Sequence, residues 1–496
     1  MKRVPLRSLL IAVGLALPFS LQAGNTPAAV PATKTPSPKY VFLFIGDGMS
    51  MTQVNSAEIY AKAIGSKEVG IKKLGFSQFP VAGMTTTYEA GSFITDSASA
   101  GTAMASGNKT LSGIINMDPG KTRKFATIAE QAKAAGYKIG IVSSVSLDHA
   151  TPASFYAKVP SRGDMYDIAV QLTQSGFDYF GGGGFAQPKG KNKDKADVID
   201  LARQSGYTYV NSREAFQALK PISGKVLAVN ATLQDASAMP YEMDRKPDDL
   251  SLADYTRKGI ELLDNKKGFF MMVEGGKIDW AGHANDAMAN ISDVIALDNA
   301  VAEAVAFQSR HPNETLILVT GDHETGGMSI GFAGTKYATF YDKVSKQTMS
   351  FQAFTDGFMK QYKAEHKGTG SFADVIPVIE KTFGLDFAKM SSDEKTQIER
   401  AFVRSMGGEI EKNPLENDYL LYGGYDPLTV KLTQILNQHA GIGWTTYSHT
   451  GVPVVTFAKG AGQELFGGYY DNTDIYRKLV RLMKLRVNTN STVAVN

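Results

Sequence analysis

Residues 40–48 read Tyr-Val-Phe-Leu-Phe-Ile-Gly-Asp-Gly, an apolar run of strand length that ends in an aspartate between two glycines. Similar runs, each rich in Val, Ile or Phe, recur at residues 137–145, 268–273, 315–320 and 452–458. Continuous apolar runs are typical of strands that are buried on both faces. Segments with helical spacing, such as residues 125–135 and 290–308, lie between them. This alternation predicts an α/β fold, a three-layer sandwich with a mostly parallel central sheet.

The composition excludes several classes of protein. The 496 residues include 52 Lys and Arg against 49 Asp and Glu, and a net charge of +3 gives no sign of a nucleic-acid-binding surface. A hydrophobic fraction of 43% is ordinary for a globular protein. The chain has no cysteine, which excludes disulfides, thiolate metal sites and a cysteine nucleophile. Any metal would therefore be held by His, Asp, Glu or hydroxyl side chains.

The amino-terminal residues have the pattern of an export signal. Three basic side chains within residues 1–7 precede an apolar run over residues 9–21, and Leu21-Gln22-Ala23 fits a signal-peptidase site. The run is short for a membrane span, although an anchor helix is the alternative. We expect residues 1–23 to be a signal peptide and residues 24–38 to be a flexible leader. The mature protein would then be exported, periplasmic or secreted, with no membrane span.

The stretch from residue 332 to residue 446 differs from the rest of the chain. It contains helical patterns at residues 372–382, 391–406 and 427–439. Ser391 and Glu394 have the spacing of a capping box at the start of the second. We expect residues 332–446 to form an inserted, mainly helical subdomain, a crown, a lid or a dimer contact. The alternative is that these helices cover one face of the sheet.

Carboxylates, imidazoles and a hydroxyl follow the predicted strands. Four strands are followed in turn by Asp47; by Asp148, His149 and Thr151; by Glu274, Asp279 and His283; and by Asp322 and His323. Ligands of open parallel sheets bind beyond the carboxyl ends of the strands, so these groups should meet at one edge. Imidazole with carboxylate suits Zn²⁺, and carboxylate with hydroxyl suits Mg²⁺. Singly, each residue has a structural alternative; Asp47, for example, could be a helix N-cap.

Ser97 is the candidate nucleophile. It lies in a run of small residues, 95–107, that we interpret as a strand-like approach to a helix N-terminus. Free backbone N–H groups favour an anion such as phosphate there. A serine hydroxyl needs a base or a metal to activate it, and the Gly-x-Ser-x-Gly elbow of Ser-His-Asp hydrolases is absent around Ser97. A metal-activated serine fits better, and close helix packing through Ala and Gly is the alternative.

Seven motifs then appear in the order of one family. They are Gly46-Asp47-Gly48-Met49, residues 95–103 (TDSASAGTA), residues 149–153 (HATPA), Ser161-Arg162, residues 273–283 (VEGGKIDWAGH), residues 322–327 (DHETGG) and residues 448–451 (SHTG). Together they resemble the metal-dependent alkaline phosphatases. The resemblance implies a secreted homodimeric enzyme that hydrolyses phosphate monoesters through a phosphoserine intermediate. Residues 39–331 and 447–496 would form its catalytic domain.

The resemblance also implies a site for two Zn²⁺ and one Mg²⁺. One zinc would be held by Asp279, His283 and His449; the second by Asp47, Asp322 and His323, with Ser97 as the activated alkoxide; and the magnesium by Asp47, Thr151 and Glu274. Arg162 would bind the phosphate oxygens that are not transferred. His149 and Trp280 would border the phosphate and the third metal. Other members of the family have different residues at these two positions, which leaves the third metal and the phosphate affinity open.

Two other kinds of function compete with this interpretation. One is a different reaction of the same superfamily, that of a phosphodiesterase, a sulfatase or a phosphoglycerate mutase. Ser97 argues against a sulfatase, export argues against the mutase, and Arg162 favours a monoester dianion over a diester. The other is a protein that binds phosphate or metal without turnover. The presence of Ser97 and Arg162 beside all the ligands argues against it.

Several further residues are interpreted as structural. His311, His366 and His439 lie outside the motifs. Residues 181–184, four consecutive glycines, lack the Lys-Ser/Thr ending of a P-loop and predict a strand-ending turn. Trp444 and Tyr447 border His449; packing is the preferred interpretation, and the alternative is that they line the mouth of the active site.

Overall fold

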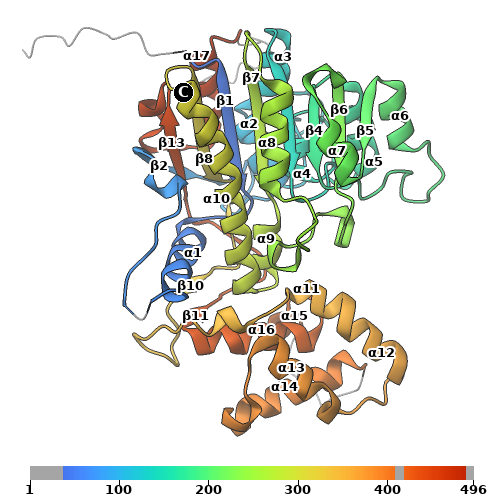
Figure 1. The fold of residues 1–496 in the computed structure, drawn as a ribbon, viewed down its shortest axis with the longest axis vertical. Coiled ribbons are helices and arrows are strands. Elements are labelled where there is room, and N and C mark those ends of the chain that lie inside the picture. The colour runs from blue at the N-terminus through green and yellow to red at the C-terminus, as the bar shows by residue number, and fades with distance from the viewer. Residues whose placement is uncertain (1–36, 67, 408–417, 487–496) are drawn as a thin grey trace, which may run out of the picture. The chain divides into compact units, whose positions relative to one another are not determined.

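The computed structural model describes residues 37–66, 68–407 and 418–486, so the expected signal peptide and nearly all of the expected leader lie outside it. Ten of its strands form one sheet. They are β1 (Tyr40–Gly46), β2 (Val81–Thr86), β3 (Lys138–Ser143), β4 (Tyr179–Gly182), β5 (Tyr207–Val210), β6 (Lys225–Val229), β7 (Phe269–Gly275), β8 (Thr315–Gly321), β13 (Val454–Gly460) and β14 (Gly468–Asp471). Their order is β14-β2-β13-β8-β1-β7-β3-β4-β6-β5 (Figure 1).

The sheet is mostly parallel, as the sequence predicts. Strand β13 runs antiparallel to β8 and β2, and the other pairings within this sheet are parallel. All five predicted strands are present. Strands β2, β4, β5, β6 and β14 were not predicted, because they are only four to six residues long and several contain glycine or polar side chains.

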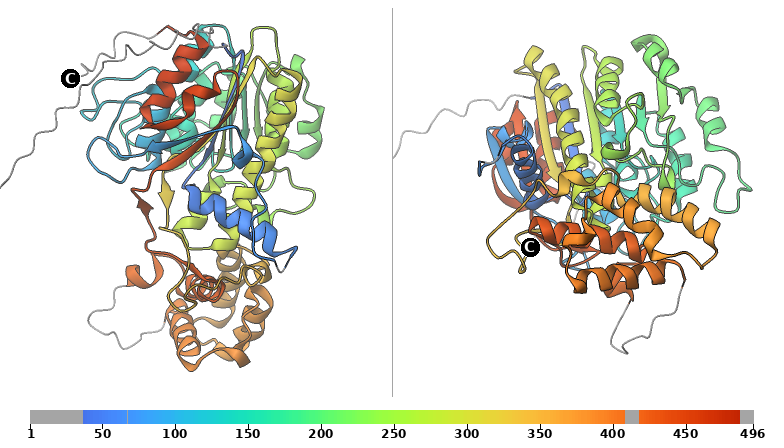
Figure 2. Two further views of the ribbon diagram at one scale, coloured as in Figure 1. Left: turned by 90° about the vertical axis from the view of Figure 1, so that its left-hand side faces the viewer. Right: turned by 60° about the horizontal axis from the view of Figure 1, so that its bottom comes forward.

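Helices cover both faces of the sheet (Figure 2). In β1, Tyr40, Phe42 and Phe44 pack into one hydrophobic core, and the alternate residues Val41, Leu43 and Ile45 pack into another. The first core is closed by α8 (Leu252–Leu263) and α10 (Ala287–Arg310). The second is closed by α2 (Ser97–Ser106), α3 (Ile128–Ala134), α5 (Met165–Gln174), α6 (Val198–Gln204) and α17 (Thr473–Met483). Two apolar faces on one strand produce the expected three layers.

A two-stranded stem carries the helical segment. Strand β10 (Ser329–Ile330) pairs antiparallel with β11 (Ile442–Gly443), so the chain leaves and returns side by side. Between them lie α11 (Phe351–Ala353), α12 (Lys360–His366), α13 (Phe372–Phe383), α14 (Ser392–Ser405), α15 (Asp418–Tyr422) and α16 (Pro427–Ala440). The predicted capping box of Ser391 and Glu394 begins α14. In Figures 1 and 2 these helices lie beyond the carboxyl ends of the strands and not on a face of the sheet. The division of the chain near residues 331 and 447 stays a prediction.

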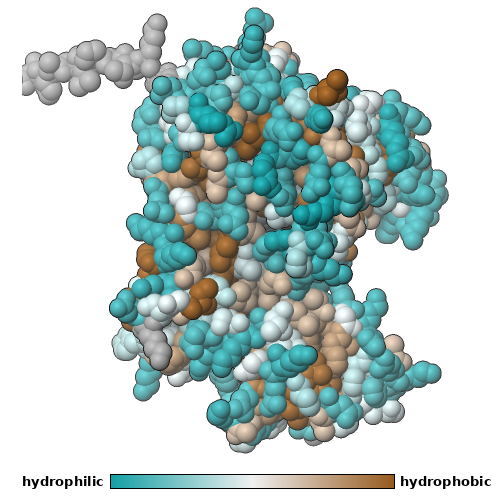
Figure 3. All heavy atoms as spheres, viewed as in Figure 1, coloured by the Kyte–Doolittle hydropathy of each residue, from teal (hydrophilic) through white to brown (hydrophobic). Residues whose placement is uncertain are grey.

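The surface shown in Figure 3 is mostly hydrophilic, with separate hydrophobic patches on both the sheet-bearing part and the helical segment. None of the helices in the described part of the chain is both long enough and apolar enough to cross a membrane.

Candidate active site

The predicted site residues meet at the carboxyl ends of four adjacent strands. Gly46 of β1 lies opposite Gly275 of β7 and Gly321 of β8. Asp47 and Asp322 therefore leave the sheet at the same level, two positions beyond Glu274. All three carboxylates are buried, each with at most 1% of its surface exposed. Ser50, and not Asp47, caps helix α1 (Met51–Ala63), so the structural alternative for Asp47 is wrong.

Gly48 allows the strand ends to approach this closely. Its φ of +70° is in the left-handed region, and its N–H donates to Asp322 Oδ1 at 3.0 Å. A Cβ atom at this position would lie 2.7 Å from Thr325 Oγ1 and 2.8 Å from the Cα of Asp279. The glycine thus allows the end of β1 to contact both Asp322 and Asp279, two of the metal-ligand candidates.

Replacing Gly48 by alanine is expected to lower the free energy of unfolding by about 2 kcal/mol or more, because the left-handed conformation and the contact with Asp279 both oppose a Cβ. Urea denaturation measures this change. Gly176→Ala is the matched control, since Gly176 has a φ of +68° but no atom within 4 Å of the added Cβ. Equal losses in the two variants would show that the close contact at Gly48 costs nothing.

Three groups of side chains could each hold a metal ion, with ligand atoms that lie within 4.8 Å of one another. They are Asp279, His323 and His449; Asp47, Asp322 and His323; and Asp47, His149 and Glu274. His283 Nε2 adjoins the first group, 3.3 Å from Asp279 Oδ1 and 3.1 Å from His449 Nε2. Thr151 Oγ1 adjoins the third, and donates to Asp47 Oδ2 at 3.2 Å. The eight side chains expected as metal ligands besides Ser97, together with His149, are thus gathered here.

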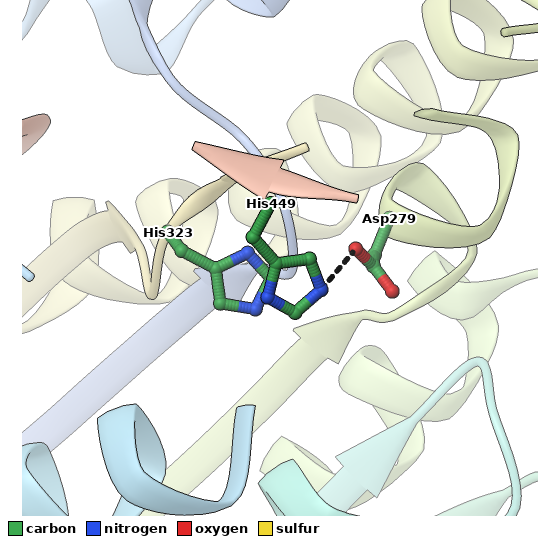
Figure 4. A group of neighbouring side chains, drawn as sticks. All are labelled: Asp279, His323 and His449. Atoms are coloured by element: carbon green, nitrogen blue, oxygen red, sulfur yellow. Dashed lines mark ion pairs between the residues drawn. The ribbon is translucent and has the colours of Figure 1, made fainter. Parts of the chain in front are cut away.

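A second two-stranded pairing brings His449 to the site. Strand β12 (His449–Thr450) pairs antiparallel with β9 (Glu324–Thr325), directly after the Asp322-His323 pair. The imidazole rings of His449 and His323 stack with centroids 3.6 Å apart, and His449 Nε2 lies 3.6 Å from Asp279 Oδ1 (Figure 4). His449 therefore joins Asp279 and His323 in one group, although it is more than 120 positions from either along the chain.

Three of the four carboxylates in this cluster, those of Asp47, Glu274 and Asp322, are buried close to one another, whereas Asp279 lies beside an imidazole. Burial, with the neighbouring carboxylates, raises the pKa of Asp47, that of Asp322 to about 8 and that of Glu274 to about 7. Burial also opposes the charge of Asp279, but His283 and His449 hold its pKa well below the usual range. Among the described residues, Asp47 Oδ1, Glu274 Oε1 and Asp322 Oδ2 are buried and have no hydrogen-bond partner. Buried carboxylate and imidazole groups with free lone pairs fit divalent metal ions.

Ser97 lies at the first position of helix α2, as predicted, and its Oγ is 3.3 Å from His323 Nε2. The strand-like approach to it is wrong, because residues 87–96 follow the end of β2 in an irregular conformation. Asp96 caps the helix by accepting from the N–H of Ser99 at 2.9 Å. The N-terminus of α2, where backbone N–H groups have no partner within the helix, thus lies beside His323.

Arg162 lies in the same cavity as Ser97. Its Nη1 is 3.0 Å from Asp96 Oδ2, and its Nη2 is 3.1 Å from His149 Nε2. Burial, followed by the positive charge of Arg162, lowers the pKa of His149 to about 3, so this imidazole is neutral. The Trp280 ring lies 5.9 Å from the ring of His149. Asp96 thus has two contacts: it caps helix α2, and it forms an ion pair with the guanidinium of Arg162.

Asp96→Asn is expected to lower kcat/KM about tenfold, because the guanidinium of Arg162 loses its ion pair and its fixed orientation. Asparagine is as good an N-cap as aspartate, so helix α2 should keep its start. Steady-state kinetics measure the change. Asp197→Asn is the control, since Asp197 caps α6 in the same way and lies 3.6 Å from Lys189 Nζ, outside the cavity. An unchanged kcat/KM in Asp96→Asn would contradict this role.

Some contacts of the site were not foreseen. Thr325 Oγ1 donates to Asp279 Oδ1 at 2.5 Å, and Ser143 donates to Glu274. The backbone carbonyl of Tyr447 accepts from His283 Nδ1 at 2.6 Å, so Tyr447 does more than pack. Asp235 and Tyr425 also line the cavity, although no motif includes them. Of the residues that were not expected in the site, only Thr325 lies within one of the seven motifs, at residues 322–327. Its place in that motif was the only indication in the sequence that it belongs to the site.

The three other histidines and the glycine run, interpreted as structural from the sequence, lie away from the metal-ligand groups. The ring of His311 contacts those of Tyr40 and Phe307, and that of His366 stacks on Tyr362. His439 Nε2 lies 2.5 Å from Glu394 Oε1, within the helical segment. The glycine run at residues 181–184 includes the last two residues of β4, in agreement with a strand-ending turn.

Comparison with known proteins decides the family. The family model described as alkaline phosphatase matches residues 38–485. The chain belongs to the alkaline phosphatase family. Alkaline phosphatase 3 of Bacillus subtilis is 32% identical, over 99% of this chain and 100% of that protein. The fold of this family and the hydrolysis of phosphate monoesters, both expected from the motifs, are thereby confirmed.

Solved structures agree with this assignment to the alkaline phosphatases. The cold-active alkaline phosphatase of a Shewanella species has a TM-score of 0.74 at 29% identity, and the match covers 90% of this chain and 99% of that chain. A mutant of the alkaline phosphatase from the Antarctic bacterium TAB5, with Mg bound in its M3 site, has a TM-score of 0.62 at 25% identity. That match covers 92% of this chain and 100% of the other. The protein is thus a phosphomonoesterase with buried groups suited to divalent metals.

Proposed function

We propose that the protein is an exported alkaline phosphatase that uses Ser97 as its nucleophile and passes through a phosphoserine intermediate. The observation that supports this most strongly is the place of Ser97. Its hydroxyl lies at a helix N-terminus, beside His323 of two candidate metal groups, in a cavity that also contains Arg162. A phosphate dianion there would meet the N–H groups of α2 and the guanidinium of Arg162.

We further propose that the three groups hold two Zn²⁺ and one Mg²⁺. Asp279, His283 and His449 would hold one zinc, and Asp47, Asp322 and His323 the other. Asp47, Thr151 and Glu274 would hold the magnesium, with His149 beside it. When bound, the two zinc ions would stabilise negative charge on the entering and leaving oxygens of the displacement, and the magnesium would add positive charge near Asp47.

The residues of the chain would act as follows. Arg162 binds two phosphate oxygens and orients the phosphorus toward Ser97. Ser97 Oγ forms a bond to phosphorus as the bond between phosphorus and the ester oxygen breaks, and the serine proton ends on the alcohol that is released. A water oxygen then bonds to phosphorus as the bond to Ser97 Oγ breaks, one water proton returns to Ser97, and inorganic phosphate is released. The first-turn N–H groups of α2 stabilise the charge on the phosphoryl oxygens in both displacements. His149 and Trp280 border the phosphate position, and the neutral His149 adds no charge of its own.

Two substrates and one chelator test this function. The metal-loaded protein is expected to hydrolyse p-nitrophenyl phosphate much faster than bis-p-nitrophenyl phosphate, and a chelator should stop both reactions. Preference for the diester would favour a phosphodiesterase. Bound metals without turnover would favour a phosphate- or metal-binding protein. Elemental analysis of the same sample should give two zinc and one magnesium per chain.

Export and homodimer formation are parts of the same proposal. N-terminal sequencing of the mature protein from the periplasm or the medium should begin after Ala23. Sedimentation should give twice the mass of the mature chain. The helical segment over residues 332–446 would form a crown or lid over the site or a contact between the two subunits.

A further inference from the structure

A second cavity adjoins the one that contains Ser97. Its volume is about 320 Å³, and Phe351 and Asp356 of the helical segment form part of its wall. Asp235, Trp280 and Tyr425 line both this cavity and the neighbouring one of about 300 Å³ that holds Ser97. Because the two cavities share these three walls, an ester whose phosphate sits at Ser97 can place its alcohol part in the second cavity.

The walls of the second cavity are aromatic and acidic. The ring of Tyr425 meets that of Phe351 edge to face, with centroids 5.5 Å apart, and Trp280 stands between the two cavities. Asp235 and Asp356 are exposed. Aromatic faces together with carboxylates attract organic cations and offer little to anions.

The two cations nearby are already engaged. Lys363 Nζ lies 2.5 Å from Asp426 Oδ2, so the charge of the third carboxylate of the wall is compensated. Lys277 is fully buried behind the wall, where its Nζ donates to Gln352 Oε1 at 3.1 Å and lies 3.8 Å from the centre of the Tyr241 ring. Neither cation forms a salt bridge with Asp235 or Asp356 in the described part of the chain, although both carboxylates attract the ammonium of Lys277, which lies behind the Trp280 ring, 4.9 Å from its centre. The two exposed carboxylates outnumber this one buried cation, so the charge that the cavity presents is negative.

Two irregular backbone segments shape this wall. The π-helical turn Phe354–Met359 joins α11 to α12 and carries Asp356. Ala236 and Ser237, directly after Asp235, have φ values of +47° and +61°. The π-helical turn and the positive φ values both cost free energy, and such features are frequent at functional sites. Their presence here is consistent with a role of this cavity in binding.

We propose that the second cavity binds an alkylammonium group on the alcohol part of the substrate, with Asp235 as the residue that sets this preference. The inference rests on the proposed function, because the alcohol part reaches the cavity only if the phosphate sits at Ser97. Choline phosphate is the probe; its hydrolysis consumes one water and gives choline and inorganic phosphate. Its uncharged isostere, 3,3-dimethylbutyl phosphate, has the same shape without the positive charge.

The experiment compares kcat/KM for these two esters. The wild-type protein is expected to favour choline phosphate about tenfold, and added salt should weaken the preference. Asp235→Asn should reduce the preference to about threefold or less, and Tyr425→Leu should do the same by removing an aromatic face. The preference is the ratio of kcat/KM for the two esters within each variant, so a change in activity that affects both esters equally leaves it unaltered. Asp342→Asn, an exposed aspartate that lines neither cavity, is the control and should behave like the wild type.

Two results would overturn the inference. One is equal kcat/KM for the two esters in the wild-type protein. The other is a preference that survives in Asp235→Asn, whose exposed side chain can be replaced without disturbing the fold. Failure of the proposed function is distinguishable, because the wild-type protein would then not hydrolyse p-nitrophenyl phosphate either.

Discussion

Ser97→Ala is expected to lower kcat for p-nitrophenyl phosphate by at least about 10³-fold, because no other hydroxyl occupies the N-terminal position of α2 beside His323. The alanine side chain is smaller than serine and favours the helix, so the fold should be kept. The zinc and magnesium content should stay near that of the wild type, since all of the other ligand candidates belong to other segments and none is changed. Stopped assays and elemental analysis on the same sample measure both quantities.

Ser106→Ala is the matched control for this variant. Ser106 is the last residue of the same helix, is equally buried, and donates only to the backbone carbonyl of Thr102. Its replacement should leave kcat unchanged. If Ser97→Ala lost its metals together with its activity, the serine would be needed for metal binding and its role as nucleophile would lose this support.

Removal of the divalent metals is expected to abolish turnover and to destabilise the protein. Asp47, Glu274 and Asp322 are buried together, and without a cation their negative charges repel one another. Ions that bind only the folded state also add to its stability by mass action. Treatment with EDTA followed by buffer exchange should lower kcat by at least about 10³-fold and lower Tm, and Zn²⁺ with Mg²⁺ should restore both. A fully active metal-free sample would contradict the metal site.

The metal-free protein should also become less stable as the pH rises from 7 to 9. The pKa of Asp322 is about 8 against an ordinary 3.8, and that of His283 is about 9 against 6.5. Both pKa values are raised in the folded state, so the folded chain holds these protons more tightly than the unfolded chain and loses that stability as they dissociate. The free energy of unfolding should fall by at least about 1 kcal/mol over this range. The free energy of unfolding of the metal-loaded protein should change less over the same range. A rise in the stability of the metal-free protein would contradict the raised pKa values of Asp322 and His283.

The sequence predicted the central layers well because their signal is local. The run at residues 40–45 is apolar at every position, and the structure buries its alternate side chains in two different cores. The edge strands are different. Strand β4, Tyr-Phe-Gly-Gly, has only four residues and two glycines, and it becomes a strand because β3 and β6 lie on either side. Its pairing partners, and not its own composition, decide its conformation.

The site shows the same division. Asp47, Glu274 and Asp322 could be placed together from the sequence, because each lies at or directly after the carboxyl end of a buried parallel strand. The position of His449 could be expected only through the family resemblance, since it depends on the pairing of β12 with β9 across the helical segment. Asp235 and Tyr425 could not be found at all. They reach the cavity through irregular loops, whose conformation no periodic pattern describes.

The covalent role of Ser97 is the central step of the proposed mechanism. The test is to mix the metal-loaded protein with p-nitrophenyl phosphate, quench the reaction in acid within a single turnover, and map the phosphoryl group by mass spectrometry of the tryptic peptide over residues 74–109. We expect one phosphoryl group, located on Ser97 and not on the other serines of that peptide, and none in Ser97→Ala. A phosphoryl group on a different residue, or full turnover in Ser97→Ala, would contradict this covalent role.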